Sequence, residues 1–84
     1  MYYLYILRFS DNSLYCGQTK DLNRRIEEHN SNDSQSKYTR SRRPVKLVYF
    51  EKYKTINDVL KREFEIKKLT KEKKENLIQK INKN

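Results

Sequence analysis

Four residues that can take part in acid–base or phosphate chemistry lie in the first 29 residues of the chain: Tyr5, Tyr15, Arg25 and His29. Tyrosine and histidine can transfer protons, and the planar guanidinium of arginine binds phosphate oxygens. Each residue also has a structural explanation. Sheets select tyrosines, an arginine stem can cover the edge of a core, and a lone histidine is more often a satisfied boundary residue. The four residues could form the larger part of a site that cuts phosphodiesters. Such a site also needs a carboxylate from another part of the chain.

Glu63 is the candidate carboxylate. On a helical projection it lies on or beside the apolar stripe that contains Val59, Leu60 and Ile66. A buried carboxylate without a partner is strongly destabilising, so its position alone favours a boundary glutamate paired with a nearby lysine or arginine. The functional alternative is a metal ligand. Mg²⁺ commonly takes one or two protein carboxylates and completes its shell with water and substrate oxygens.

The first half of the chain predicts a hairpin. Residues 2–9 are an aromatic and aliphatic run of strand length, residues 10–13 have turn chemistry, and residues 14–17 resume an extended pattern. Because the first run is apolar on both faces, we expect it in the centre of a sheet. Gly17 is the only glycine. We expect it to end the second strand, where a side chain would not fit or a ligand comes close.

A helical pattern follows the hairpin. Residues 45–50 are then expected to form a third strand, and two more helical patterns come after it. The first helix is expected to reach about Asn30, with Thr19 or Asp21 as its cap, and capping signals at Thr55 and Thr70 begin two more helices. The inner faces are predicted to contain Leu22, Arg25, Ile26 and His29 in the first helix, Ile56, Val59, Leu60, Phe64, Ile66 and Leu69 in the second, and Leu77, Ile78 and Ile81 in the third.

The order β-β-α-β-α-α predicts an α+β fold in which a small, mostly antiparallel three-stranded sheet is flanked by helices. The 84 residues suffice for one small domain, and no linker divides residues 1–84. The two tyrosines, the arginine, the histidine and the glutamate are expected to converge on one sheet-and-helix face.

The composition of the chain favours some classes of binding partner over others. The chain has 20 Lys and Arg against 11 Asp and Glu, a formal charge of +9, which is typical of a protein that binds a polyanion such as nucleic acid. Solubility and a genome rich in Lys and Asn codons are the alternative explanation for the charge. No segment is apolar enough to span a membrane, and no signal pattern is present, so we expect a cytoplasmic protein. The single cysteine excludes an internal disulfide.

The densest basic cluster precedes the third strand. It can contact a phosphate backbone, and a solvated loop is an alternative of nearly equal weight. Tyr38 within it can stack on an unpaired base. The candidate nucleic-acid-binding residues are Lys37, Tyr38, Arg40, Arg42, Arg43 and Lys46.

These residues resemble the GIY-YIG nuclease superfamily, which is named after two triplets on a hairpin. The triplets correspond here to Tyr3-Leu4-Tyr5 and Tyr15-Cys16-Gly17. Arg25 matches the family's arginine, and His29 stands where many members have histidine or tyrosine. Arg62-Glu63 resembles the segment with the family's metal-binding glutamate.

Further residues are similar to the small standalone bacterial branch of this superfamily, namely Tyr38-Thr39-Arg40 and Arg43-Pro44. The resemblance extends from about Tyr3 to Ile78. Tyr3 replaces a glycine of the first triplet and Cys16 an isoleucine of the second, and neither change removes a side chain expected to do chemistry. The C-terminal asparagine of some members has no assigned counterpart.

The resemblance implies an endonuclease that uses one divalent cation, Mg²⁺ or Mn²⁺, held by Glu63. Water is the expected nucleophile and a tyrosine the expected base, with Tyr5 preferred and Tyr15 next. Arg25 would bind the phosphate, and His29 would orient the tyrosine or relay its proton. DNA is favoured over RNA, and the chain is expected to be a monomer or weak homodimer. The alternatives are a non-catalytic nucleic-acid-binding module with the same fold and, with less support, a basic scaffold for an acidic protein.

Overall fold

The computed structural model describes residues 1–30 and 43–82. Their fold is α+β, with the predicted order β-β-α-β-α-α. In chain order the elements are β1 (Tyr2–Arg8), β2 (Leu14–Thr19), α1 (Leu22–Asn30), β3 (Lys46–Tyr53), α3 (Ile56–Lys67) and α4 (Lys71–Asn82). None of the helices in this described part of the chain is both long and apolar enough to cross a membrane.

The three strands form an antiparallel sheet in the order β2-β1-β3, so β1 is central as predicted. Both outer strands run further than the sequence indicated, because β1 offers pairing partners along its whole length. Tyr3 pairs with Thr19 at one end of β2, and Tyr2 pairs with Tyr53 at the end of β3. The expectation that Gly17 ends its strand is therefore wrong. It lies within β2, opposite Tyr5.

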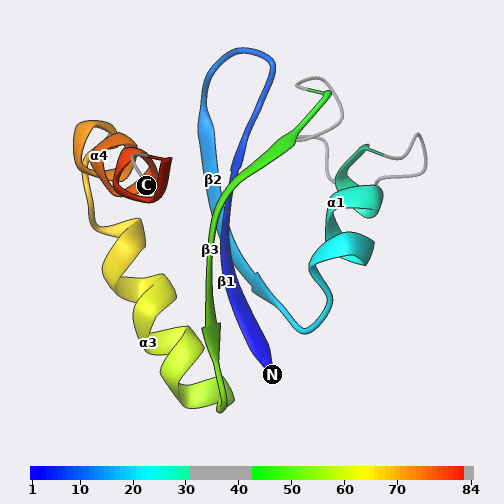
Figure 1. The fold of residues 1–84 in the computed structure, drawn as a ribbon, viewed down its shortest axis with the longest axis vertical. Coiled ribbons are helices and arrows are strands. Elements are labelled where there is room, and N and C mark those ends of the chain that lie inside the picture. The colour runs from blue at the N-terminus through cyan, green and yellow to red at the C-terminus, as the bar shows by residue number, and fades with distance from the viewer. Residues whose placement is uncertain (31–42, 83–84) are drawn as a thin grey trace.

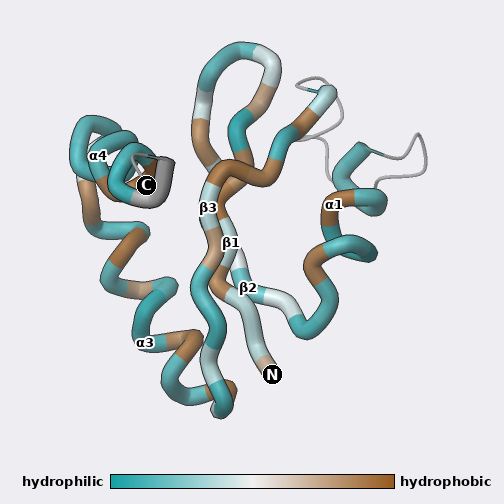
Figure 2. Tube along the Cα trace, viewed as in Figure 1, coloured by the Kyte–Doolittle hydropathy of each residue, from teal (hydrophilic) through white to brown (hydrophobic). Residues whose placement is uncertain are grey.

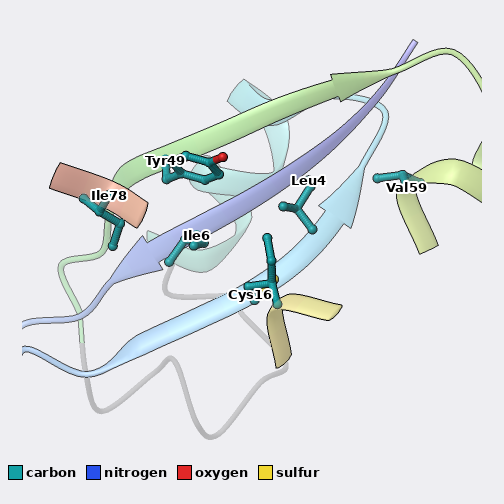
Figure 3. Close-up of a cluster of buried hydrophobic side chains, with 7 residues drawn as sticks. Leu4, Ile6, Cys16, Tyr49, Val59 and Ile78 are labelled. Carbon is teal, nitrogen blue, oxygen red and sulfur yellow. The ribbon is translucent and has the colours of Figure 1, made fainter. Parts of the chain in front are cut away.

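The helices cover both faces of the sheet. Figure 1 shows α1 on one side and α3 with α4 on the other, and Figure 2 shows hydrophobic segments along the strands between them. Side chains alternate along a strand, so the core divides into two clusters. Leu4, Ile6 and Cys16 pack with residues of α3 and α4 (Figure 3). Tyr5 and Leu7 belong to the second cluster, against α1.

Helix starts follow the predicted capping chemistry. The Asp21 carboxylate accepts a hydrogen bond from the backbone N–H of Arg24 at 3.1 Å, and Thr19 Oγ1 in turn accepts from the N–H of Asp21. Thr55 and Thr70 cap α3 and α4 through their hydroxyl oxygens, each at 3.2 Å from a backbone nitrogen. Such caps satisfy N–H groups that have no partner inside the helix.

The inner face of α3 differs from the prediction. Val59 and Ile66 are fully buried, and Leu69, just after the helix, packs against the core as expected. Ile56, Leu60 and Phe64, in contrast, are exposed. Arg62 turns toward the sheet in their place, so the buried stripe runs at i, i+3 and i+7 from Val59. In α4, Leu77 and Ile78 face the core as predicted, and the side chain of Ile81 lies outside the described residues.

An ionic network joins α3 to β3. Arg62 donates hydrogen bonds from Nε and Nη2 to the two oxygens of Glu51, at 2.9 and 3.1 Å. The hydroxyls of Tyr49 and Tyr53 donate to the same carboxylate. Burial alone would raise the pKa of Glu51, but the hydrogen bonds from Arg62 and the two tyrosines hold it below its usual value. The network therefore anchors α3 against the sheet.

A second ion pair anchors α4. Arg8 at the end of β1 donates from Nη1 and Nη2 to the two carboxylate oxygens of Glu75, at 2.7 and 2.6 Å. A paired guanidinium and carboxylate of this geometry are bound more strongly than a neutral hydrogen-bonded pair. Both helices on this face are thus attached to the sheet by one arginine and one glutamate each.

Glu51→Gln is expected to lower the free energy of unfolding by about 2 kcal/mol at neutral pH, because the charged hydrogen bonds to Arg62 are weakened. The wild-type protein should lose stability as the pH falls below the usual glutamate value of 4.5. In that range the unfolded chain binds more protons than the folded one. Urea unfolding at a series of pH values measures both effects.

The matched control is Glu27→Gln on the exposed surface of α1. The midpoint of its urea unfolding, and the change of that midpoint with acid pH, should stay close to those of the wild type. Equal stability of Glu51→Gln and wild type across the acid range would contradict the anchoring role of the network.

Candidate active site

Tyr5 lies at the centre of the candidate site. Its side chain is 2% exposed, in the cluster under α1, and its hydroxyl extends over the backbone of β2 at Gly17. A Cβ atom at residue 17 would lie 2.6 Å from Tyr5 Oη and 3.2 Å from Tyr15 Cε1. Any side chain there would push the tyrosine away. The single glycine of the chain thus creates the space that the Tyr5 hydroxyl occupies, as the sequence had suggested.

Tyr15 and His29 pack around Tyr5. The ring centroids of Tyr15 and His29 are 5.5 Å apart, and those of Tyr5 and Tyr15 are 6.3 Å apart. Tyr15 is 36% exposed, whereas His29 is 8% exposed. Nε2 of His29 is buried and has no hydrogen-bond partner among the described residues. Burial, and then the charge of Arg25, lower the pKa of His29, so its ring is neutral at physiological pH.

Arg25 lies on α1, one turn before His29, and is partly exposed. Its Nη1 is 3.7 Å from a carboxylate oxygen of Glu28. Burial raises the pKa of Tyr5 well above the usual value of 10, with a smaller contribution from Tyr15 in the same direction, and the charge of Arg25 opposes that rise. Arg25 is thus close enough to act electrostatically on both Tyr5 and His29. The structure brings together the four residues from the N-terminal part of the chain, as predicted.

Glu63 approaches this group from the other side of the sheet. It lies on α3, whose buried residues pack with Leu4, Ile6 and Cys16 rather than with Tyr5. The expectation of a single shared face is therefore wrong. Periodicity places a residue on a helix face, but it does not decide which face of the sheet that helix covers.

The two sides of the sheet influence each other electrostatically. Glu63 is near enough for its negative charge to contribute to the raised pKa of Tyr5 and of Cys16. The first cause in both cases is burial, which together with the charges raises the pKa of Cys16 to about 11. Among the described residues, β2 pairs only with β1, so no described strand pairs with its outer edge. Gly17 leaves only backbone between the Tyr5 hydroxyl and that edge.

Among the described residues, Lys67 is the basic partner of the Glu63 carboxylate. Its side chain is 19% exposed, and Oε2 lies 3.5 Å from Nζ of Lys67, an exposed lysine one turn later. The structural explanation, a boundary glutamate paired with a lysine, thus agrees with the geometry. Residues 1–30 and 43–82 contain no group of three His, Cys, Asp or Glu side chains that could hold a metal. A single solvent-reachable carboxylate still fits Mg²⁺ or Mn²⁺, which complete their shells with water and substrate oxygens.

Only part of the predicted nucleic-acid-binding cluster can be located. Lys37, Tyr38, Arg40 and Arg42 lie outside the described residues. Arg43 donates from Nη1 to the carbonyl of Asn30 at the end of α1, at 3.3 Å, and Lys46 is exposed at the start of β3. Asn30 also accepts from the backbone N–H of Val45 at 2.8 Å. No pattern in the sequence predicted this bridge between α1 and β3, nor the Glu51–Arg62 network.

Gly17→Ala is expected to destabilise the protein by about 1–3 kcal/mol, because the added methyl group clashes with the Tyr5 ring and hydroxyl. The cost should be smaller in a Tyr5→Leu background, where the clashing atoms are absent. Thermal unfolding of the two single variants and the double variant measures this coupling. Gln18→Ala, at the next position of β2, is the control. Equal costs in both backgrounds would contradict the contact.

Comparison with known proteins identifies the family of the chain. The family model described as the GIY-YIG catalytic domain matches residues 1–76. UPF0213 proteins of Staphylococcus aureus strains Mu3 and MW2 are each 52% identical over 77 residues, covering 92% of this chain and 93% of the relative. The solution NMR structure of a UPF0213 protein from Bacillus halodurans is 39% identical, with a TM-score of 0.61, and the match covers 94% of this chain and 84% of that one. The chain therefore belongs to the GIY-YIG family, a family of the nuclease type, and is similar to its small UPF0213 members.

Proposed function

We propose that the protein is a metal-dependent endonuclease that hydrolyses phosphodiester bonds of nucleic acid, with DNA favoured over RNA. One observation carries the proposal. Tyr5 reaches over Gly17 to a strand edge with which no described strand pairs. Burial is the main cause of the raised pKa of Tyr5, and Arg25 and Glu63, which come from opposite sides of the sheet, both lie near enough to add smaller contributions. A cation-binding carboxylate and an arginine on either side of one strand edge suit a bound phosphodiester.

Arg25 binds the phosphate in this proposal. Its guanidinium is always charged and presents several N–H donors in one plane, which match the non-bridging oxygens. Its ion pair with Glu28 is long, at 3.7 Å, and lies at the helix surface, so it competes weakly with a phosphate. Charge that develops on the phosphoryl oxygens in the transition state strengthens the interaction.

Glu63 would hold one Mg²⁺ or Mn²⁺, with water and phosphate oxygens as the remaining ligands. When bound, such a cation neutralises phosphoryl charge and stabilises the leaving oxygen. In the protein without a bound cation, the Lys67 ammonium pairs with the Glu63 carboxylate. Because Lys67 is exposed and has a flexible stem, it can turn away from the carboxylate.

The two tyrosines differ in the roles they can take. Burial raises the pKa of Tyr5, which keeps its hydroxyl protonated and suits it to donate a hydrogen bond. Tyr15 is exposed and is therefore the better candidate for removing a proton from the attacking water. We accordingly prefer Tyr15 as the base, which reverses the order suggested by the sequence. His29 is neutral, and its Nε2 has no hydrogen-bond partner among the described residues. It can therefore accept the hydroxyl proton that Tyr15 gives up when Tyr15 takes a proton from the water.

Basic side chains would hold the rest of the substrate through its phosphates. Arg43 and Lys46 lie at the β3 end of this set, with Lys37, Tyr38, Arg40 and Arg42 preceding them in the sequence. The formal charge of +9 favours contact with a polyanion. Binding through phosphates should therefore weaken steeply as salt increases.

Arg25→Ala and Glu63→Gln are each expected to slow cleavage by about 100-fold or more, because each removes a group that stabilises the transition state. The measurement is single-turnover cleavage of labelled DNA and RNA oligonucleotides with Mg²⁺ or Mn²⁺. Substrates should include single strands, duplexes, nicked duplexes and branched forms. Nucleic-acid binding by both variants should remain within a few-fold of the wild type.

Neighbouring residues provide matched controls. Arg24→Ala removes an exposed arginine that pairs with the same Glu28, and Glu65→Gln removes an exposed carboxylate on the same helix as Glu63. Both should cut at close to the wild-type rate. An undiminished rate for Glu63→Gln would exclude its proposed role. Salt-sensitive binding without cleavage of any substrate would support the non-catalytic nucleic-acid-binding module instead.

A further inference from the structure

An apolar strip lies on the outer surface of α3. Ile56, Leu60 and Phe64 follow one another at spacings of four residues, so they are neighbours on the helix surface. All three are exposed, and Phe64 is 64% exposed. Exposed apolar side chains that adjoin one another on a surface are typical of a contact site, whereas singly scattered ones are normal.

Lysines are neighbours of Phe64 on the surface of α3. The residues three and four positions from Phe64 on the helix are Leu60, Lys61, Lys67 and Lys68. Nζ of Lys68 lies 4.1 Å from the centroid of the ring. The matching partner must therefore be anionic and also present a flat apolar surface. An unpaired nucleobase with its phosphate has both properties, since every base has a face that can stack on an aromatic ring.

The strip borders the candidate active site. Glu63 has four neighbours on the surface of α3, of which Val59 and Ile66 are buried in the core. Its two exposed neighbours are Leu60 and Lys67, and both of these also adjoin Phe64. A strand whose phosphate reaches Glu63 would thus lie next to Leu60 and Phe64.

We propose that Leu60 and Phe64 form a stacking platform for an unpaired nucleobase beside the scissile phosphate, with Lys61, Lys67 and Lys68 binding the adjacent phosphates. This inference rests on the proposed nuclease function and specifies its substrate class. The preferred substrate has unpaired bases at the cut, as in a single strand, a flap or a frayed end. A fully paired duplex keeps its bases stacked inside and cannot use the platform.

The test is binding to a fluorescently labelled single strand and to the duplex of the same sequence, without divalent cations so that neither is cut. Phe64→Leu keeps an apolar side chain but removes the ring. It should weaken single-strand binding by about 5- to 100-fold and leave duplex binding unchanged. Phe64→Trp should retain single-strand affinity. In a strand with 2-aminopurine, the wild type should quench the fluorescence of the base, and Phe64→Leu should not.

Phe50→Leu is the matched control, because Phe50 is an exposed aromatic residue on β3, the sheet edge opposite β2. It should bind both probes like the wild type. If Phe64→Leu binds the single strand as tightly as the wild type while the wild type still cuts nucleic acid, the platform is wrong and the proposed function stands. If the wild type binds neither probe, both the stacking platform and the proposed nuclease function are wrong. If Phe64→Leu changes only the sedimentation of the free protein, a second copy of the chain covers the strip and the platform is wrong.

Discussion

Burial of β1 on both faces is the constraint on which the rest of the structure depends. Alternate residues of this strand face opposite sides, so Leu4 and Ile6 pack under α3 and α4 while Tyr5 and Leu7 pack under α1. A central strand separates the two sides, and side chains from opposite faces can meet only at an edge. The candidate site therefore lies at β2, where Gly17 leaves room for the Tyr5 hydroxyl over the backbone.

Three consecutive residues of α3 face three different surroundings. Successive residues of a helix are rotated by about 100°. Arg62 faces β3 and binds Glu51, Glu63 follows on the side that influences Tyr5 and Cys16, and Phe64 comes next among exposed lysines. The Glu51–Arg62 network therefore sets the rotation of the helix, and with it the directions of Glu63 and Phe64. A helix rolled by one residue would exchange these directions.

Burial and charge assign different protonation states within the site. Tyr5 is buried and keeps its proton, and the pKa of His29 is lowered so that its ring is neutral. Tyr15 is in contact with both rings and remains accessible. A small domain with a limited core thus still provides a protonated donor, a neutral acceptor and an exposed hydroxyl within one cluster.

Local chemistry in the sequence was sufficient to predict the hairpin, the three helices, the caps at Thr55 and Thr70, and the cluster of Tyr5, Tyr15, Arg25 and His29. These features depend on turn residues, capping and periodicity over a few residues. Only the tertiary structure decided that α3 covers the face opposite α1, that Leu60 and Phe64 remain exposed, and that Arg62 takes the inner position. Periodicity defines the faces of one element, but the packing of one element on another selects which face is buried.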